Sequence, residues 1–289
     1  SGNPVTLRIR PSAVNTGVWF RRMDSVDGDA FVPAIWDFAE HSPLCTRLVN
    51  ADGVSVATVE HLMAGLAGCG INNALVELDG PEVPILDGSA HEFVTAFLDA
   101  GIVEQSAPVR AIRILKPVRV ENGDAWAELQ PDTAIRMDFV IDFDEAAIGH
   151  QEKSMTLANG AFVHDLCDSR TFCRNADVEM MRANGLALGG TLENAVVFDK
   201  DVVLSPGGLR HSDEPVRHKM LDAMGDLALA GAPIIARYCG HKAGHTLTNM
   251  LLRALFDTPD AFETFECDSA TMALLPGADV TREDVPVLA

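Results

Sequence analysis

One stripe of side chains in the segment VRHKMLDAMGD carries residue types that bind metals and move protons. His218, Asp222 and Asp226 recur every four residues, so on a helix they lie along one face, with Met220 and Met224 on the opposite side. An imidazole and a carboxylate one turn apart can ligate one metal ion from the same side, as the two histidines of a zinc-binding H-E-x-x-H motif do. The pattern indicates a metal site or an acid–base site on this helix.

Two further segments place histidines where predicted helices begin. Glu60 and His61 are adjacent at the start of an apolar helix, and His245 follows Gly244 at the start of another. A buried carboxylate needs a proton to accept, and a general base beside a metal-bound water has that role. The helix dipole disfavours an imidazolium at a helix N-terminus, so His245 needs a carboxylate neighbour to act as an acid, and we expect Asp226. Histidines and carboxylates on separate helix starts suit a catalytic zinc with three protein ligands and an open fourth position.

These residues also have simpler interpretations. The stripe could be a solvated polar face, and a histidine on an apolar helix is more often a satisfied core residue than a ligand. His241 and His245 are also four apart, but Gly244 favours a turn between them, which argues against a two-histidine pair. We predict structural or solvated roles for the remaining histidines: His41, His91, His150, His164 and His211.

Composition narrows the classes of partner. The formal net charge of −20 argues against nucleic acid and against docking on an anionic membrane. No apolar run of about 18 residues is present, so no transmembrane segment is predicted. The six cysteines form no CxxC pair, which is typical of free thiols in a reducing compartment, and we expect a cytoplasmic monomer. An anionic substrate would need a local basic patch, which four residues beside the motifs could supply: Arg170, Arg217, Lys219 and Lys242.

The elements that must position these residues follow a repeated pattern of strands and then helices. Strands are predicted at 5–9, 17–21, 46–49, 54–57 and 73–78, with helices at 60–67 and 90–100. Ser89 and Glu92 match a capping box at the second helix. A polar, proline-containing segment at 104–109 is typical of a linker.

After this segment the pattern restarts. Strands are predicted at 112–120, 125–129 and 135–143, followed by a helix at 177–184, a strand at 195–198 and the helix of the stripe, with Pro215 as its first residue. Two strand sets followed by helices predict an α+β fold of two similar domains, residues 1–106 and 107–289, with a small αβ insert at about 173–198.

Several motifs, in chain order, extend the candidate site. They are EHLMA at 60–64, PILDGSA at 84–90, SRTF at 169–172, GG at 189–190, RHKMLDA at 217–223, GD at 225–226, and GH at 244–245 with Asn249. Together they resemble the UDP-3-O-acyl-N-acetylglucosamine deacetylase family, the zinc amidases that commit material to lipid A in Gram-negative bacteria. The resemblance implies two domains, each a sheet packed against two helices, with the active site between them.

The resemblance also implies roles for individual residues. The zinc ligands would be His61, His218 and Asp222. Glu60 would be the general base that takes a proton from zinc-bound water, and Thr171 would donate a hydrogen bond to the oxyanion. His245, oriented by Asp226, would stabilise the oxyanion and protonate the leaving amine.

The implied substrate is an acylated UDP-sugar. Lys219 would help hold it, Asp142 and Phe143 match a uridine-contacting pair, and Phe172 would be a further contact. The insert would wall an apolar passage for the acyl chain. Its expected lining is Val178, Leu186, Ala187, Thr191 and Val197.

Three departures from the family pattern stand out. Cys173 replaces a usual Gly, which predicts a stiffer mouth of the passage. Ala125 stands where a Lys often precedes Trp126, which removes one contact on the nucleotide side. A strand ending in Gly-Leu-His normally precedes the position of Ser1. None of these changes touches the expected metal or acid–base groups.

Two other functional classes stay open. A zinc hydrolase acting on a different amide, such as a peptide, would use the same ligands but would not require the apolar insert. A non-catalytic binding module with a structural zinc would need four protein ligands, and a fourth is not evident.

Overall fold

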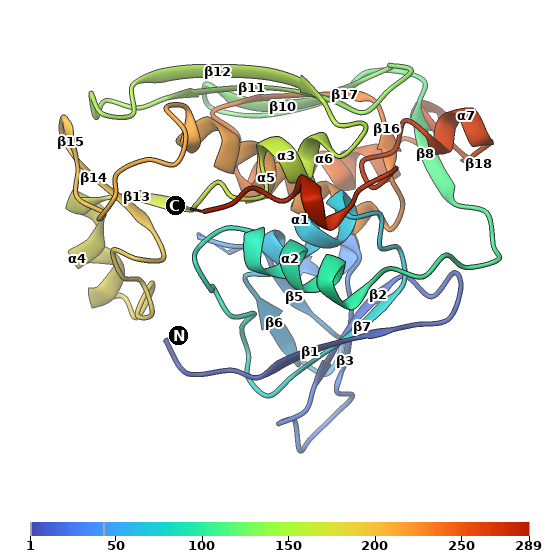
Figure 1. Ribbon diagram of the computed structural model, residues 1–289, viewed down its shortest axis with the longest axis horizontal. Helices are drawn as coiled ribbons and strands as arrows, with labels where there is room; N and C mark the ends of the chain where they lie inside the picture. The colour runs from blue at the N-terminus through green and yellow to red at the C-terminus, as the bar shows by residue number, and fades with distance from the viewer. Residues whose placement is uncertain (1, 43, 289) are drawn as a thin grey trace.

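The structure is a computed structural model that describes residues 2–42 and 44–288 as a mixed α+β fold. Most of its helices gather between sheets above and below them (Figure 1). The helices of the described residues are α1 (Glu60–Gly68), α2 (His91–Ala100), α3 (Ala161–Asp165), α4 (Asn175–Ala183), α5 (Glu214–Leu227), α6 (His245–Phe256) and α7 (Ser269–Met272). No helix of the described residues combines the length and the apolar character that crossing a bilayer requires.

Among the described residues, the strands of the first half form two sheets. The larger has the order β1-β7-β2-β3, from β1 (Leu7–Pro11), β7 (Ala74–Leu78), β2 (Val18–Arg22) and β3 (Phe31–Pro33). The smaller has the order β4-β5-β6, from β4 (Ala39–Glu40), β5 (Arg47–Val49) and β6 (Ser55–Ala57). In the larger sheet β2 runs parallel to β7 with Phe20 opposite Val76, and both side chains are fully buried. The larger sheet therefore contributes apolar side chains to the hydrophobic core.

The strands described in the second half form three sheets. The largest has the order β12-β11-β17-β10-β9, from β12 (His150–Thr156), β11 (Arg136–Asp142), β17 (Arg237–His241), β10 (Ala125–Gln130) and β9 (Val118–Asn122). A second contains β16 (Ile234–Ile235), β8 (Arg110–Ile114) and β18 (Phe262–Glu266), and a third contains β13 (Phe172–Arg174), β14 (Val196–Asp199) and β15 (Val202–Val203). Helix α5 packs on β11 and β12, and α6 packs on β9 and β10, so one sheet supports both helices.

Most of the predicted elements are confirmed to within two residues, but the strand predicted at 112–120 is wrong. The chain leaves β8 after Ile114 and enters β9 at Val118, in a different sheet. Between them the N–H groups of Leu115 and Lys116 donate to the Ala261 carbonyl oxygen rather than to a sheet partner. Proline has no N–H to donate to a strand, and Pro117 marks the break.

The predicted capping box of α2 is also absent. The residue at the N-cap is Ala90, which has no side chain to cap the helix. The Ser89 hydroxyl lies one position too early and donates to the Asp87 carboxylate at 2.8 Å, while it accepts the His91 N–H at 3.1 Å. The Ser89 hydroxyl therefore binds the Asp87 carboxylate in the preceding turn instead of capping α2. In α5, Pro215 is the second helical residue rather than the first.

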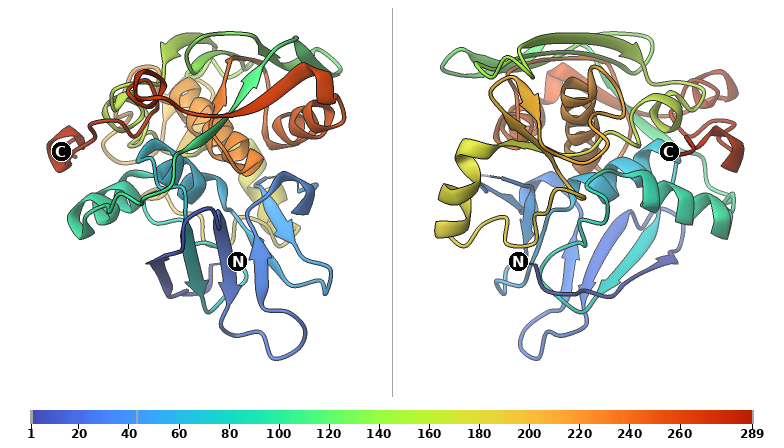
Figure 2. Two further views of the ribbon diagram at one scale, coloured as in Figure 1. Left: turned by 90° about the vertical axis from the view of Figure 1, so that its right-hand side faces the viewer. Right: turned by 60° about the vertical axis from the view of Figure 1, so that its left-hand side comes forward.

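The two halves of the chain meet through helices. Within residues 2–42 and 44–288, no strand of β1–β7 shares a sheet with a strand of β8–β18. Helix α1 packs against α5, and Figure 2 shows both between the sheets of the two halves. Gly225 permits this contact, because a Cβ atom built there would lie 2.0 Å from the Glu60 carbonyl oxygen. A glycine on α5 therefore brings the start of α1 against the stripe of polar residues.

Candidate metal centre and active site

Three buried side chains from two helices converge at the contact between the halves. His61 comes from α1, and His218 and Asp222 come from α5. Asp222 Oδ1 lies 3.2 Å from His218 Nε2 and 3.5 Å from His61 Nε2. One ligand atom from each residue lies within 4.8 Å of the other two. The structure thus brings together the three residues predicted to hold a metal ion.

The donor set fits a zinc ion. Asp222 Oδ1 is buried and has no hydrogen-bond partner among the described residues, an unfavourable state that a bound cation would relieve. The His218 Nδ1–H donates to the Ser169 carbonyl oxygen at 3.0 Å, which leaves Nε2 free to ligate. Two imidazoles and one carboxylate are a ligand set typical of catalytic zinc, which keeps a fourth position open.

Two groups able to move protons lie beside these ligands. Glu60, the first residue of α1, is 3% exposed. His245, the first residue of α6, places its Nε2 at 3.8 Å from Glu60 Oε1. The Nδ1–H of His245 donates to Asp226 Oδ2 at 2.8 Å, so Asp226 fixes the orientation of the ring. The predicted base and the predicted acid therefore face one another.

Their surroundings give the two groups different pKa values. Burial is the main influence on Glu60 and raises the pKa of its carboxyl to about 7, although His245 acts in the other direction. Burial lowers the pKa of His245, but the charges of Asp226, Glu60 and Asp222 outweigh it and raise the pKa to about 10. Near pH 7 the imidazole is a cation and the carboxyl is close to its midpoint, which suits an acid and a base.

Lys219 binds Oδ2 of Asp222, the carboxylate oxygen that is not expected to ligate the metal. Its Nζ lies 2.7 Å from Asp222 Oδ2. Burial raises the pKa of Asp222, but the charges of His218, Lys219 and His245 more than compensate and hold it well below its usual range. Asp222 is therefore ionised, with Oδ2 on Lys219 and Oδ1 directed at the two histidines.

A family model described as UDP-3-O-acyl N-acetylglycosamine deacetylase matches residues 1–257. The UDP-3-O-acyl-N-acetylglucosamine deacetylase of Shewanella halifaxensis is 49% identical over 265 residues, which cover 91% of this chain and 86% of the relative. The enzyme of the same name from Shewanella oneidensis is 48% identical over 286 residues, 97% of this chain and 93% of the relative. The chain belongs to this family.

In this family member a row of aromatic rings leads away from the metal ligands. The Phe172 ring packs edge-on against His218, with centroids 6.3 Å apart, and against Phe143 at 5.6 Å. It also contacts Phe198 at 6.0 Å, and Lys219 Nζ lies 5.9 Å from its centroid. Phe172 therefore connects the metal ligands to the insert and to one of the two residues expected to contact uridine.

The other expected uridine contact, Asp142, is exposed at the end of β11. Lys242 Nζ lies 3.3 Å from Asp142 Oδ2 and 2.9 Å from Asp124 Oδ2, so the lysine is shared between two carboxylates. In the insert, Val178 on α4 and Leu186 are half-buried and Val197 on β14 is buried. Two other expected lining residues, Ala187 and Thr191, are exposed.

Backbone bonds hold Thr171 between a turn and the insert. Its N–H donates to the Gly88 carbonyl oxygen at 2.7 Å, and its carbonyl accepts the Val196 N–H at 2.8 Å. A Cβ at Gly88 would lie 3.2 Å from Thr171 Cγ2 and 2.1 Å from the Asn194 carbonyl oxygen. Only a glycine fits this turn, where the family motif PILDGSA meets the motif SRTF.

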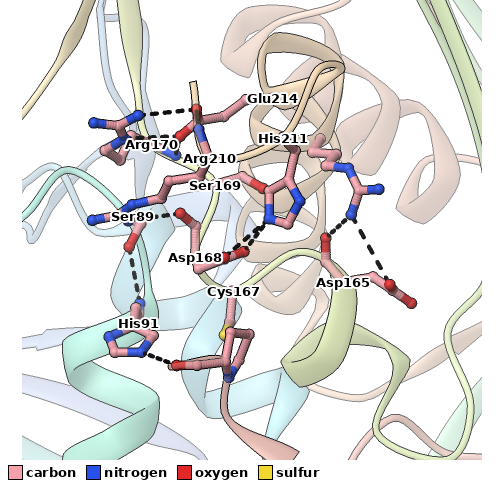
Figure 3. Close-up of polar contacts among 12 residues, drawn as sticks. Ser89, His91, Asp165, Cys167, Asp168, Ser169, Arg170, Arg210, His211 and Glu214 are labelled. Atoms are coloured by element: carbon pink, nitrogen blue, oxygen red, sulfur yellow. Dashed lines mark hydrogen bonds and ion pairs between the residues drawn. The ribbon is translucent and has the colours of Figure 1, made fainter. Parts of the chain in front are cut away.

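A network that no sequence motif indicates fixes the segment before Thr171 (Figure 3). Arg170 is buried and donates through Nε to Glu214 Oε1 at 2.9 Å, and its backbone N–H donates to the same oxygen at 3.0 Å. The prediction that Arg170 contributes to a basic patch for an anionic substrate is therefore wrong, because Glu214 binds its guanidinium in the interior. The pair instead ties α5 to the segment whose Ser169 carbonyl orients His218.

Several of the other histidines make contacts with residues outside the metal-binding cluster. His241 ends β17 and His245 begins α6, so these two do not share a helix. His211 Nε2 lies 2.9 Å from Asp168, which Figure 3 shows next to the Arg170 pair. His91 Nε2 is 2.9 Å from the Pro286 carbonyl oxygen, a structural contact.

Two cavities border the helices of the site. One of about 300 Å³ adjoins His245 and Thr46. A larger crevice of about 1620 Å³ is lined by other residues of α1 and α5, including Met63 and Met224, and by none of the predicted site residues. The larger crevice lies along apolar faces of these helices, so cavity size alone does not locate the chemistry.

Proposed function

We propose that this protein is a zinc-dependent deacetylase that removes the N-acetyl group of UDP-3-O-acyl-N-acetylglucosamine in lipid A biosynthesis. The observation that carries the proposal is the convergence of His61, His218 and Asp222 beside Glu60 and His245 in a member of this family. The convergence supports the presence of a cation site, a base and an acid within one buried cluster. Metal-assisted hydrolysis of an amide uses a cation, a base and an acid together.

The cofactor that we propose is zinc, held by Nε2 of His61, Nε2 of His218 and Oδ1 of Asp222. When bound, zinc supplies a Lewis acid that polarises the acetamide carbonyl and makes a nearby water more acidic. The orphaned Oδ1 atom and the tautomer that Ser169 imposes on His218 support this assignment. The three residues also leave space in the ligand shell for the substrate.

Glu60 is the proposed general base. It takes a proton from the attacking water as the water oxygen bonds to the carbonyl carbon. The pKa of about 7 that burial gives Glu60 supports this role, because a base with a pKa near the working pH transfers protons efficiently.

His245 is the proposed general acid. It donates a hydrogen bond to the developing oxyanion and gives a proton to the nitrogen as the C–N bond breaks, releasing acetate and a free amine. Its pKa of about 10, raised above all by Asp226, supports the acid role. The Thr171 hydroxyl is the proposed second donor to the oxyanion, and removal of one such donor costs roughly 10²–10³ in rate.

The proposed substrate contacts extend from Lys219 along Phe172 to Phe143 and Asp142. The ring contacts between Phe172, Phe143 and His218 support this direction. The insert at 173–198 is the proposed wall of the acyl passage, with the lining Val178, Leu186, Ala187, Thr191 and Val197. The half-buried or buried state of Val178, Leu186 and Val197 supports the proposal.

We retain three broader proposals. The chain divides into domains 1–106 and 107–289, supported by the separate sheets of its halves. The protein is cytoplasmic, supported by six cysteines that are all unpaired, as in reducing compartments. A monomeric state stays a prediction from the sequence.

An acetate-release assay tests the proposed function. With zinc-loaded protein we expect turnover of the 3-O-acylated UDP-sugar and much slower turnover of the non-acylated UDP-sugar. Equal rates would contradict the acyl passage, and release from an acetylated peptide alone would favour the competing amidase.

Glu60→Gln keeps the shape of the base but cannot accept the proton. We expect kcat to fall about 10²–10⁴-fold with full zinc content. Zinc content by elemental analysis is the control, because an inactive variant that has lost its metal says nothing of the base. Near-normal turnover in this variant would exclude the role of Glu60.

A further inference from the structure

Thr46 contacts both of the groups that move protons. It lies immediately before β5 and is 2% exposed. Its backbone N–H donates to Glu60 Oε2 at 3.0 Å, and its hydroxyl donates to Asp226 Oδ1 at 2.5 Å. A single buried residue of the first half thus connects the base on α1 with the carboxylate on α5 that orients the acid.

The Thr46 hydroxyl supplies one of the two hydrogen bonds that hold the Asp226 carboxylate. One oxygen of this carboxylate accepts from the Thr46 hydroxyl, and the other accepts from the Nδ1–H of His245. Asp226 is 1% exposed, so solvent does not supply a replacement donor. Without the hydroxyl the carboxylate has one fixed oxygen instead of two, and it can rotate about its side-chain bonds.

We propose that Thr46 is a positioning residue for proton transfer, which holds Asp226 so that His245 Nε2 stays aimed at the reacting amide. This inference rests on the proposed deacetylase function. The two contacts of Thr46 can be separated, because a change of side chain removes the bond to Asp226 and leaves the backbone bond to Glu60. A misplaced acid slows the chemical step, whereas binding of the substrate does not depend on it.

The test compares Thr46→Val, which keeps the shape and removes the hydroxyl, with Thr46→Ser, which keeps the hydroxyl. Thr95→Val is the matched control, because the partly buried Thr95 on α2 has a hydroxyl with no hydrogen-bond partner among the described residues. All proteins are loaded with zinc and assayed for acetate release from the acylated UDP-sugar. Zinc content and thermal unfolding are measured on the same samples.

We expect Thr46→Val to lower kcat about 10–100-fold, with KM within about twofold of wild type and full zinc content. Thr46→Ser restores most of the lost rate, and Thr95→Val turns over like wild type. A purely structural role predicts instead a lower melting temperature with unchanged kcat in the folded fraction. If Thr46→Val does not fold, Thr46→Ala provides the same comparison with Thr46→Ser.

Wild-type kcat in a folded Thr46→Val protein would overturn the inference, as would a Thr46→Ser protein as slow as the variants without a hydroxyl. Both results presuppose an active wild type and leave the deacetylase function intact. A zinc-loaded wild type that releases no acetate would contradict the proposed function itself.

Discussion

Glu60 and His245 are 3.8 Å apart, yet their surroundings give them different proton affinities. Burial favours the protonated form of Glu60 more strongly than the charge of His245 opposes it, which brings the pKa of this carboxyl to about 7. His245 is surrounded by three carboxylates, which favour the imidazolium and bring its pKa to about 10. Between about pH 7 and pH 10, Glu60 is therefore mainly an ionised base while His245 is mainly a cationic acid.

This difference predicts a bell-shaped dependence of kcat/KM on pH. Activity rises as Glu60 loses its proton near pH 7 and falls as His245 loses its proton near pH 10. Bound zinc adds positive charge, which favours deprotonation and moves both limbs to lower pH. A pH–rate profile of the zinc-loaded enzyme measures both limbs.

Asp226→Asn removes one of the charges that raise the pKa of His245, so its basic limb should lie at lower pH than that of wild type. The acidic limb should also move to lower pH, because the charge of Asp226 raises the pKa of Glu60 as well. A basic limb that stays in place would mean that another group gives rise to it.

At the scale of the elements, the site depends on how closely α1 and α5 approach. A Cβ atom at Gly225 would lie 2.0 Å from the Glu60 carbonyl oxygen and 3.1 Å from the Ala64 nitrogen, so a side chain there must push the helices apart. Because His61 lies on α1 and Asp222 on α5, a wider separation also moves the metal ligands apart. Helix packing and metal geometry are thus coupled through one glycine.

Gly225→Ala should therefore destabilise the fold and weaken zinc binding. We expect a loss of about 1–3 kcal/mol in the free energy of unfolding from overpacking, despite the better helix propensity of alanine. Urea unfolding and zinc titration measure the two effects. Gly65→Ala on α1 is the control, because its nearest contact is an ordinary 3.4 Å from Phe97. A Gly225→Ala protein as stable as wild type would show that the helices can part without cost.

The Arg170–Glu214 pair connects the start of α5 to the segment 168–171. The side chains of Arg170 and Glu214 are only 8% and 1% exposed, so solvent screens the pair weakly. The backbone N–H of Arg210 also donates to Glu214, at 2.7 Å. Three chain segments therefore meet at one carboxylate.

Glu214→Gln should leave the Arg170 charge buried without a counter-charge. We expect a loss of about 3–5 kcal/mol in the free energy of unfolding, together with weaker zinc binding as the Ser169 carbonyl shifts from His218. Chemical unfolding is the measurement. Glu263→Gln, in the exposed pair with Arg113, is the control and should cost less than about 1 kcal/mol. Similar losses in the two variants would contradict a specific role for the buried pair.

At the scale of the whole molecule, one metal ion would join residues from both halves of the chain. His61 belongs to the half with strands β1–β7, and His218 and Asp222 belong to the half with β8–β18. The unfolded chain does not hold these residues together, so zinc binds the folded state preferentially. Binding of this kind raises the free energy of unfolding of the entire molecule.

Removal of the metal should therefore lower the melting temperature reversibly. Free zinc at about 100 times its dissociation constant stabilises by about 2.7 kcal/mol. Thermal unfolding with a chelator, and again after zinc is restored, measures the difference. Asp222→Ala should show little of this shift, because it lacks one ligand. Equal melting temperatures with and without metal in the wild type would argue against a site that spans the two halves.

The sequence by itself determined the features that depend on local periodicity and on motifs. His218, Asp222 and Asp226 share one face of α5 because a helix repeats every 3.6 residues. Most helices and strands could be predicted because apolar residues recur with a period of 3.6 in a helix and of about two in a strand. The family could be identified because long motifs such as EHLMA and RHKMLDA occur in order.

Only the tertiary structure decided which groups meet across the chain. The Ser169 carbonyl that orients His218 has no side-chain signal, because every residue carries the same backbone oxygen. Thr46 lies 180 residues from Asp226, and Arg170 could equally have faced solvent or substrate. Such partners depend on how α1, α5 and the segments beside them pack, and helix periodicity carries no information about contacts between separate elements.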